Sequence, residues 1–395
     1  MDRSLPRASD LSQSHGLSRA AALADVLATL RDASVRDLGW LLLAPRLLSA
    51  QAFGSLLVPP PDDVTELVRA LHALDEDPLP LHASLAPLTT RRVGHYAERL
   101  VHYAISSLSS YTLVAANLPL RLQKQTVGEC DFLLEDPAGM RLHWELAVKC
   151  YLRVDAHAVD DPLAAFVGPA LGDRLDIKLA RLLDHQLPLS GRPDYVDLLP
   201  RGPWQAQMWV SGWLFDRFDH WLAGRAINVD PRLAADLSTG FWAPVGRWPE
   251  LASTIGAQGW TRLPRLRWIA PLAEPDASYC DDATMTARIA DAFAQLQPVG
   301  SVEEMAPADT TNTTNTTNAT HVLDRAETAG LRFDAQVPGV LPAVAEGCVP
   351  RARVRDDPFA IAAWKRGADG RWFECARGFI VADDWEARAL SFAAS

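Results

Sequence analysis

Two stretches of the chain decide the fold that we predict: residues 128–134 (GECDFLL) and residues 143–149 (HWELAVK). Both place polar and apolar side chains in alternation, which is typical of β-strands with one buried face. Pro137, Ala138 and Gly139 lie between them and favour a turn. We therefore predict a β-hairpin in which the numbers of opposed residues sum to roughly 276 to 278.

One face of this hairpin carries acidic side chains and a lysine. Glu129 and Asp131 share a face of the first strand, because side chains alternate along a strand. Glu145 and Lys149 share a face of the second strand in the same way. In the predicted register Asp131 faces Glu145 or Ala147. Two carboxylates whose β-carbons are about 5 Å apart repel each other unless a proton or a cation lies between them.

Mg²⁺ is the cation that this arrangement favours. It takes one or two carboxylates, keeps several waters and accepts phosphate oxygens. It also polarises a phosphoryl group and lowers the pKa of an attacking water. We therefore predict a Mg²⁺ (or Mn²⁺) site held by Asp131 and Glu145, with Glu129 as a further ligand. Lys149 would position the water or stabilise developing charge.

The same residues also have a simpler interpretation. A half-buried strand shows polar side chains to solvent at alternate positions, and Glu129 with Lys149 is then a cross-strand salt bridge. Glu145 and Lys149 are four residues apart, which is about 13 Å along a strand. Both reach one metal ion only if their side chains converge or a bulge shortens the strand.

The composition is that of an ordinary soluble globular protein. Of the 395 residues, 48% are hydrophobic and 22% are charged, and the net charge is -11. This acidic balance disfavours a broad nucleic-acid footprint, so a site for a polyanion would have to be local. The five cysteines are scattered without a Cys-x-x-Cys pair, which indicates reduced thiols in a cytoplasmic protein and no zinc site.

We expect no membrane contact. The N-terminus lacks the apolar region of a signal peptide. The most apolar early stretch, residues 38–50, is interrupted by Pro45 and Arg46 and is too short to span a bilayer. A soluble, intracellular protein is the expectation; the sequence does not indicate its oligomeric state.

Composition and hydrophobic periodicity divide the chain into five predicted segments. In chain order they are an N-terminal helical segment (1–88), an α/β core (89–216), a Trp-rich extension of that core (217–305), a low-complexity Thr/Asn linker (306–322) and a small C-terminal β-rich unit (323–395). Within the core the order is helix, three strands, helix, strand. We therefore predict an α/β (α+β) fold.

Eight of the thirteen tryptophans lie between Trp204 and Trp268. Aromatic side chains at this density stack on the bases of single-stranded nucleic acid in some proteins. They more often fill a core, because buried aromatics dominate core energetics. We expect a core.

A basic stripe follows the hairpin. In the helix that we expect to begin after an N-cap at Asp173, four basic side chains fall on one face at i, i+4, i+7 and i+11. They are Arg174, Lys178, Arg181 and His185. Such a stripe supplies phosphate contacts in nucleic-acid-binding proteins. Asp176 and Asp184 dilute it, so a solvated helix face is the alternative.

The two hairpin stretches, with residues 172–179 (GDRLDIKL) and 185–187 (HQL), resemble a bacterial domain-of-unknown-function family, numbered eighteen fifty-three. The resemblance runs from about Arg91 to the C-terminus. The arrangement also looks like the PD-(D/E)xK nuclease superfamily, whose core is helix, three strands, helix, strand. That superfamily carries an acid on the second strand and acid-x-Lys on the third.

The resemblance implies a nuclease-like fold and a Mg²⁺-dependent nuclease, or a descendant of one. It implies catalytic roles for Asp131, Glu145 and Lys149, and it adds Glu98 of the first helix as a further metal-binding acid. The chain departs from the pattern at Ala147, which occupies the acid position before Lys149. The alternative is a non-catalytic binding or scaffold protein that keeps the fold. A serine-hydrolase motif, Gly-x-Ser-x-Gly, is absent.

Overall fold

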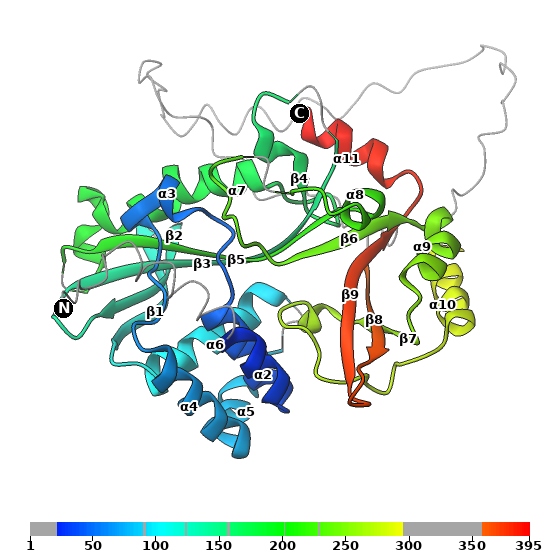
Figure 1. Ribbon diagram of the computed structural model, residues 1–395. Helices are drawn as coiled ribbons and strands as arrows, with labels where there is room; N and C mark the ends of the chain where they lie inside the picture. Colours follow the sequence, from blue (N-terminus) through cyan, green and yellow to red (C-terminus); the bar gives the residue numbers. More distant parts are fainter. Residues whose placement is uncertain are drawn as a thin grey trace, which may run out of the picture.

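The computed structural model describes residues 22–89, 92–122, 125–155, 159–200, 202–227, 230–294 and 358–395. These residues form a mixed α/β fold around a nine-stranded sheet (Figure 1). The strand order is β1-β2-β3-β5-β6-β9-β8-β7, and the short β4 pairs with β3. The predicted linker, 306–322, lies outside the described residues.

The sheet contains antiparallel pairs at both ends and parallel pairs in the middle, where β3, β5, β6 and β9 run in the same direction. Its strands are β1 (Thr112–Leu122), β2 (Gln125–Glu135), β3 (Arg141–Arg153), β4 (Phe166–Val167), β5 (Gln205–Arg217), β6 (Thr239–Pro244), β7 (Gly259–Leu263), β8 (Phe359–Arg366) and β9 (Trp372–Val381).

Helices cover both faces of the sheet, with α2, α4, α5 and α6 on one side and α7 and α11 on the other (Figure 1). The α-helices are α2 (Ala33–Leu43), α3 (Ala50–Phe53), α4 (Val64–Glu76), α5 (Leu79–Leu85), α6 (Val93–Ser107), α7 (Leu175–Arg181), α8 (Phe218–Leu222), α9 (Trp248–Ile255), α10 (Asp282–Ala294) and α11 (Trp385–Ala393). In the described part of the chain no helix has the length and apolar content to cross a membrane.

From α6 to β5 the order of the main elements is the predicted one: helix, three strands, helix, strand. The two-residue β4 is an addition. β1 begins at Thr112, which pairs with Glu135 of β2. Gln125 is the first residue of β2.

The predicted hairpin forms in the predicted register. Phe132 lies opposite Trp144 and Leu133 opposite His143, so opposed residue numbers sum to 276. The Asp136 carboxylate stabilises the turn by accepting hydrogen bonds from the main-chain N–H groups of residues 138 and 140, at 2.9 and 2.8 Å.

The two strands then separate. N-terminal to Phe132, β2 continues against β1 down to Gln125, whereas β3 continues against β5. The last pair between β2 and β3 is Phe132 with Trp144. We call the point beyond this pair, where the two strands separate, the fork. The β3–β5 ladder runs from Leu142 to Leu152 with no register shift, so no bulge shortens β3.

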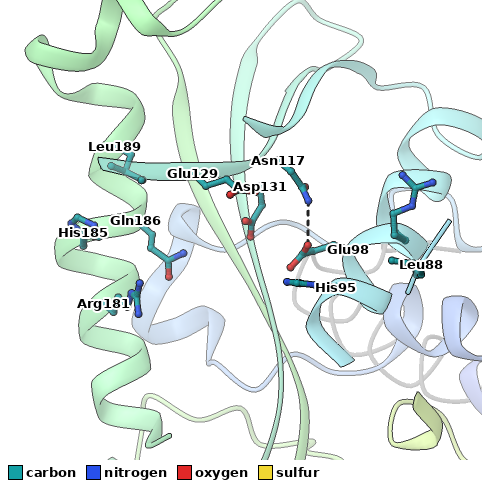
Figure 2. A pocket seen from close by; sticks show the side chains of 12 residues that line it. Leu88, His95, Glu98, Asn117, Glu129, Asp131, Arg181, His185, Gln186 and Leu189 are labelled. Carbon is teal, nitrogen blue, oxygen red and sulfur yellow. Dashed lines mark hydrogen bonds between the residues drawn. The ribbon is translucent and has the colours of Figure 1, made fainter. Parts of the chain in front are cut away.

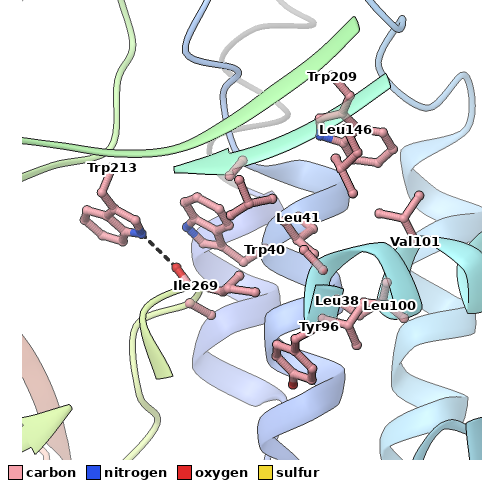
Figure 3. Close-up of a cluster of buried hydrophobic side chains, with 14 of the residues drawn as sticks. Leu38, Trp40, Leu41, Tyr96, Leu100, Val101, Leu146, Trp209, Trp213 and Ile269 are labelled. Carbon is pink, nitrogen blue, oxygen red and sulfur yellow. Dashed lines mark hydrogen bonds between the residues drawn. The ribbon is translucent and has the colours of Figure 1, made fainter. Parts of the chain in front are cut away.

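The two faces of β3 enter different hydrophobic clusters. Trp144, Leu146 and Val148 belong to a cluster shared with α2 and α6. Figure 3 shows part of it, with Leu146 and Trp209 of the sheet above the side chains of these helices. Ala147 and Tyr151 belong instead to a cluster with side chains of α7. The predicted alternation of faces is therefore confirmed.

Most tryptophans of the Trp-rich stretch from Trp204 to Trp268 lie in the hydrophobic core. Six of these eight tryptophans are buried: Trp204, Trp209, Trp213, Trp242, Trp248 and Trp260. The core interpretation is confirmed for these six. Base stacking would require rings that are open to solvent.

The C-terminal segment supplies two inner strands near one end of the sheet. β9 pairs in parallel with β6, and β8 pairs with the edge strand β7, so the β8–β9 hairpin lies between two strands of the Trp-rich extension. The two strands are joined by a turn at residues 367–370. The described part of the predicted C-terminal unit is therefore joined to the rest by main-chain hydrogen bonds, and the domain boundaries stay predictions.

Candidate functional site

A polar pocket of about 500 Å³ opens beside the fork (Figure 2). Side chains from four parts of the chain reach it. The polar residues that line it are His95, Glu98 and Arg99 of α6, Asn117 of β1, Glu129 and Asp131 of β2, and Arg181, His185 and Gln186 of the helical segment that begins with α7. The pocket therefore gathers acidic, basic and amide groups at the edge of the hairpin.

Asp131 stands at the fork itself. Its Oδ2 accepts a 2.8 Å hydrogen bond from the main-chain N–H of Leu146, so the carboxylate contacts β3 where the ladder has ended. Burial raises the pKa of Asp131 to about 8, and the negative charges of Glu145 and Glu98 act in the same direction. The predicted juxtaposition of Asp131 with Glu145 therefore has an electrostatic consequence in the folded chain.

Glu145 is fully buried, and side chains hold both of its carboxylate oxygens. Its Oε1 accepts from His143 Nε2 at 2.9 Å, and its Oε2 accepts from Gln186 Nε2 at 2.6 Å. On the other side of the imidazole, Ser190 Oγ lies 2.9 Å from His143 Nδ1. These two hydrogen bonds fix the orientation of the Glu145 carboxylate.

Gly128 allows β2 to approach the helical segment closely. A Cβ atom at this position would lie 2.7 Å from a methyl carbon of Leu189. Leu189 lines the same pocket, so this contact keeps the wall that carries His185 and Gln186 near the acids of β2.

Glu98 of α6, the further acid that the resemblance implies, lines the same pocket as Asp131. Asn117 Nδ2 donates to Glu98 Oε2 at 3.4 Å (Figure 2). Burial raises the pKa of Glu98, and the charges of Glu129 and Glu145 add to the effect. Asn117 has a left-handed backbone with φ of 49°, a conformation that asparagine adopts more readily than most residues.

Lys149 does not reach the pocket. Its Nζ donates to Asp173 Oδ2 at 2.5 Å, so the alternative salt bridge with Glu129 is not formed. The physical reason is the fork: β2 has left β3 before Glu129, which pairs with Pro119 of β1. The straight β3–β5 ladder also keeps Lys149 away from Glu145.

Lys178 is the ammonium group whose charge acts on both carboxylates. Its Nζ donates to Gln186 Oε1 at 2.8 Å, and Gln186 in turn donates to Glu145. Burial and then the charge of Lys149 lower the pKa of Lys178, whereas the charges of Glu145 and Asp131 raise it. From the sequence we predicted phosphate contacts for this lysine and no role for Gln186, because only the fold brings both residues to β3.

A π-helical turn positions the two pocket residues His185 and Gln186. α7 ends at Arg181 and continues as η3 (Leu182–Gln186), a π-helix turn that is wider than an α-helical one. Its last two residues, His185 and Gln186, line the pocket. Such turns are frequent at functional sites.

The predicted basic stripe is divided by the structure. Arg181 and His185 are exposed and line the pocket. Arg174 is buried and forms an ion pair with Asp176, and its Nη1 donates to main-chain oxygens at the end of α11. The stripe therefore does not act as one face, and Arg174 is directed away from the pocket.

The helix also begins differently from the prediction. Arg174 occupies the N-cap position of α7, and Asp173 does not cap it. The Asp173 carboxylate instead accepts from Lys149 and, at 3.4 Å, from the hydroxyl of Tyr151. Its attraction to the lysine of β3 outweighs its preference for a cap.

The donor set fits Mg²⁺ better than a metal that needs several protein ligands. Within the described ranges, no group of three or more His, Cys, Asp or Glu side chains is placed to hold a metal ion. Asp131 offers a carboxylate at the open pocket, whereas Glu145 is fully buried and does not line it. Mg²⁺ accepts one or two carboxylates with waters. Glu129 and Glu98, the two further acids of the predicted metal site, line the pocket with Asp131.

Fold and site together define a mixed α/β protein with a carboxylate pocket at the fork of two sheet strands. A family model described as "Domain of unknown function (DUF1853)" matches residues 36–322, and the chain belongs to this family. The match begins before the predicted start near Arg91, and β8, β9 and α11 lie outside it. No curated protein and no solved structure matches the chain.

Proposed function

We propose that this protein is a Mg²⁺-dependent (or Mn²⁺-dependent) phosphodiesterase that acts on nucleic acid: a nuclease, or a protein derived from one. The observation that carries the proposal is Asp131 in a polar pocket whose wall includes Arg181 and His185, with its pKa raised by burial and by the charge of the buried Glu145. The order of elements from α6 to β5 supports a nuclease-like core of the PD-(D/E)xK type.

The chain would contribute to the reaction in three ways. Asp131 and Glu145 would hold the cation, which supplies charge stabilisation at phosphorus and a water of lowered pKa. His143 and Gln186 would fix the orientation of Glu145 through their hydrogen bonds. Lys178, rather than Lys149, would stabilise developing negative charge near the two carboxylates.

Arg181 and His185 would contact the substrate phosphates from the exposed wall of the pocket. Arg174 is left out of this role because its guanidinium is held by Asp176 and the end of α11. The local character of this basic group is compatible with a net charge of -11.

The test is cleavage of single- and double-stranded DNA and RNA with Mg²⁺ or Mn²⁺. We expect Asp131→Asn and Lys178→Met each to lower the rate by about 100-fold or more, the usual loss on removing an electrostatic group of this kind. Lys149→Met is the matched control and should retain most of the activity. Cleavage that survives Asp131→Asn, or no cleavage of any substrate, would overturn the proposal.

A non-catalytic binding or scaffold protein is the second candidate. It is favoured by Ala147 at the acid position before Lys149 and by the ion pair of Lys149 with Asp173. Calorimetric titration with Mg²⁺ separates the two functions. The phosphodiesterase should take up Mg²⁺ in a manner that Asp131→Asn abolishes, whereas the scaffold protein should take up none.

A further inference from the structure

A second pocket, of about 320 Å³, lies between the sheet and α6, on the side of the sheet to which Trp144 points. Trp144 and Trp209 form its sheet side, and Ile105 and Tyr111, from the end of α6 and just beyond it, form another wall. Pro59 and its neighbours close it from the loop before α4. Trp144 adjoins Glu145 in sequence but points to the other face, so this pocket is separate from the carboxylate site.

Three aromatic rings give the pocket its shape. Tyr111 and Trp144 have ring centroids 5.2 Å apart at an interplanar angle of 62°, and Trp144 and Trp209 are 6.2 Å apart at 73°. Both indole N–H groups are used inside the protein: Trp144 donates to Gln207 at 2.8 Å and Trp209 to Ser211 at 3.0 Å. Trp144 and Trp209 are 5% and 4% exposed, so they give the pocket a narrow apolar edge and no indole donor, and the half-buried Tyr111 is the more open aromatic ring.

The size of the pocket suits a small ring system. A cavity of about 150 Å³ accommodates one benzene ring. Pockets of roughly 300 Å³ and more, lined by apolar and aromatic side chains with a few polar groups, are typical of small-molecule sites. A two-ring aromatic body is therefore the appropriate size.

The charged groups at the pocket favour a cation. Its mouth carries three exposed carboxylates, at positions 62, 63 and 66. Asp63 caps α4 and Glu66 pairs with Arg69. Among the residues that the structure describes, Asp62 has no hydrogen-bond or ion-pair partner. Burial, and then the charge of Asp62, raises the pKa of Tyr111, which places this carboxylate near the aromatic wall.

The cationic side chain in the lining, Arg46, is committed to the protein. Its guanidinium carbon lies 3.8 Å from the ring centroid of Trp209. Arg46 Nη1 also donates to the main-chain oxygen of Leu41 at 2.7 Å and to Ser211. The charge that faces a ligand at the mouth is therefore negative.

We propose that this pocket binds a small aromatic amine, with its two-ring body against Tyr111 and Trp144 and its protonated amine at Asp62. The aromatic faces add cation–π attraction to the contact with the carboxylate. An aromatic carboxylic acid of the same shape would be repelled by the mouth. This inference is independent of the proposed phosphodiesterase activity.

The test compares two probes of one shape, 2-(aminomethyl)naphthalene and 2-naphthoic acid, by isothermal titration at pH 7 with the full chain. We expect saturable binding of the amine, at least about tenfold tighter than of the acid, because the exposed carboxylates at the mouth attract the ammonium group and repel the carboxylate of the acid; tenfold corresponds to about 1.4 kcal/mol. Asp62→Asn, on the surface, should remove most of this difference. Asp291→Asn, an exposed residue of α10, is the charge-matched control and should leave it unchanged.

Ala104→Phe, which fills the pocket from α6, should abolish binding of both probes. If this variant fails to fold, Asp62→Asn still decides the question. Equal binding of amine and acid, amine binding that Asp62→Asn leaves intact, or no saturable binding of the amine would each overturn the proposal.

Discussion

Single side chains fix the geometry of the carboxylate site through one continuous chain of hydrogen bonds. Ser190, His143, Glu145, Gln186 and Lys178 follow one another in this chain, with separations of 2.9, 2.9, 2.6 and 2.8 Å. Buried polar groups are costly unless each has a partner. Removing one member therefore affects its neighbours on both sides.

Gln186→Leu tests this dependence. The substitution leaves Glu145 Oε2 and the Lys178 ammonium without their hydrogen bonds, and an unsatisfied buried group costs about 1–3 kcal/mol. We expect the free energy of unfolding to fall by that amount in urea titrations. His185→Leu changes the adjacent exposed residue and should alter stability by about 0.5 kcal/mol or less. Equal effects of the two substitutions would contradict the role of Gln186.

A second buried acid makes stability depend on pH. Asp37 of α2 accepts hydrogen bonds from the Tyr96 hydroxyl at 3.0 Å and from the main-chain N–H of Ala270 at 2.9 Å. Burial nevertheless raises the pKa of Asp37 from 3.8 to about 6. Between these two values the folded state binds more proton than the unfolded state, so the contribution of Asp37 to stability falls as pH rises through the folded-state pKa and becomes constant above about pH 7.

Asp37→Asn removes this titration while keeping groups that can pair with Tyr96 and Ala270. The wild-type protein should therefore lose stability relative to the variant as pH rises from about 4 to 7. Urea titrations at several pH values measure the difference. Parallel pH dependence of the two proteins would show that Asp37 does not titrate in this window.

The backbones of β3 and β5 approach each other closely at Gly212. Gly212 of β5 pairs with Lys149 and has a φ of 143°, and a Cβ atom there would lie 1.7 Å from the Lys149 carbonyl oxygen. No residue with a side chain fits this position without displacing the backbone. The close approach contributes to the straight course of β3, which keeps Lys149 away from Glu145.

Gly212→Ala should therefore destabilise the protein by about 3 kcal/mol or more, in the range expected of a backbone conflict in a core strand. Gly172→Ala is the control, because a Cβ atom there meets nothing within 4 Å. Thermal unfolding of both variants gives the comparison. A Gly212→Ala protein as stable as the control would contradict the close approach of the two strands.

The whole molecule depends on its C-terminal residues. β9 and β8 lie between β6 and β7, and their inward side chains Phe359, Ile361 and Ile380 share a cluster with Trp260. Without them β7 loses its partner strand, β6 keeps only β5 as a neighbour, and the aromatic cluster is open to water.

Deletion of residues 358–395 should thus prevent cooperative folding, although these residues lie outside the family match. Circular dichroism and size-exclusion chromatography of the truncated chain are the measurements. A truncated protein that is soluble, monodisperse and unfolds cooperatively would show that residues up to 294 form an independent core.

Local pattern in the sequence was sufficient for the hairpin, its register, the alternation of faces along β3 and the order of elements from α6 to β5. These features depend on turn residues and on the period of two, which act over a few residues. The family, too, was recognisable from short stretches around the hairpin.

The tertiary structure alone decided which groups meet Asp131 and Glu145. Three features decided this: β2 separates from β3 at the fork, a π-turn brings Gln186 to Glu145, and Lys149 forms an ion pair with Asp173. Each depends on residues far apart in the chain. The insertion of β8 and β9 between β6 and β7 also joins residues far apart in the chain. Such contacts depend on packing between distant elements, on which local periodicity carries no information.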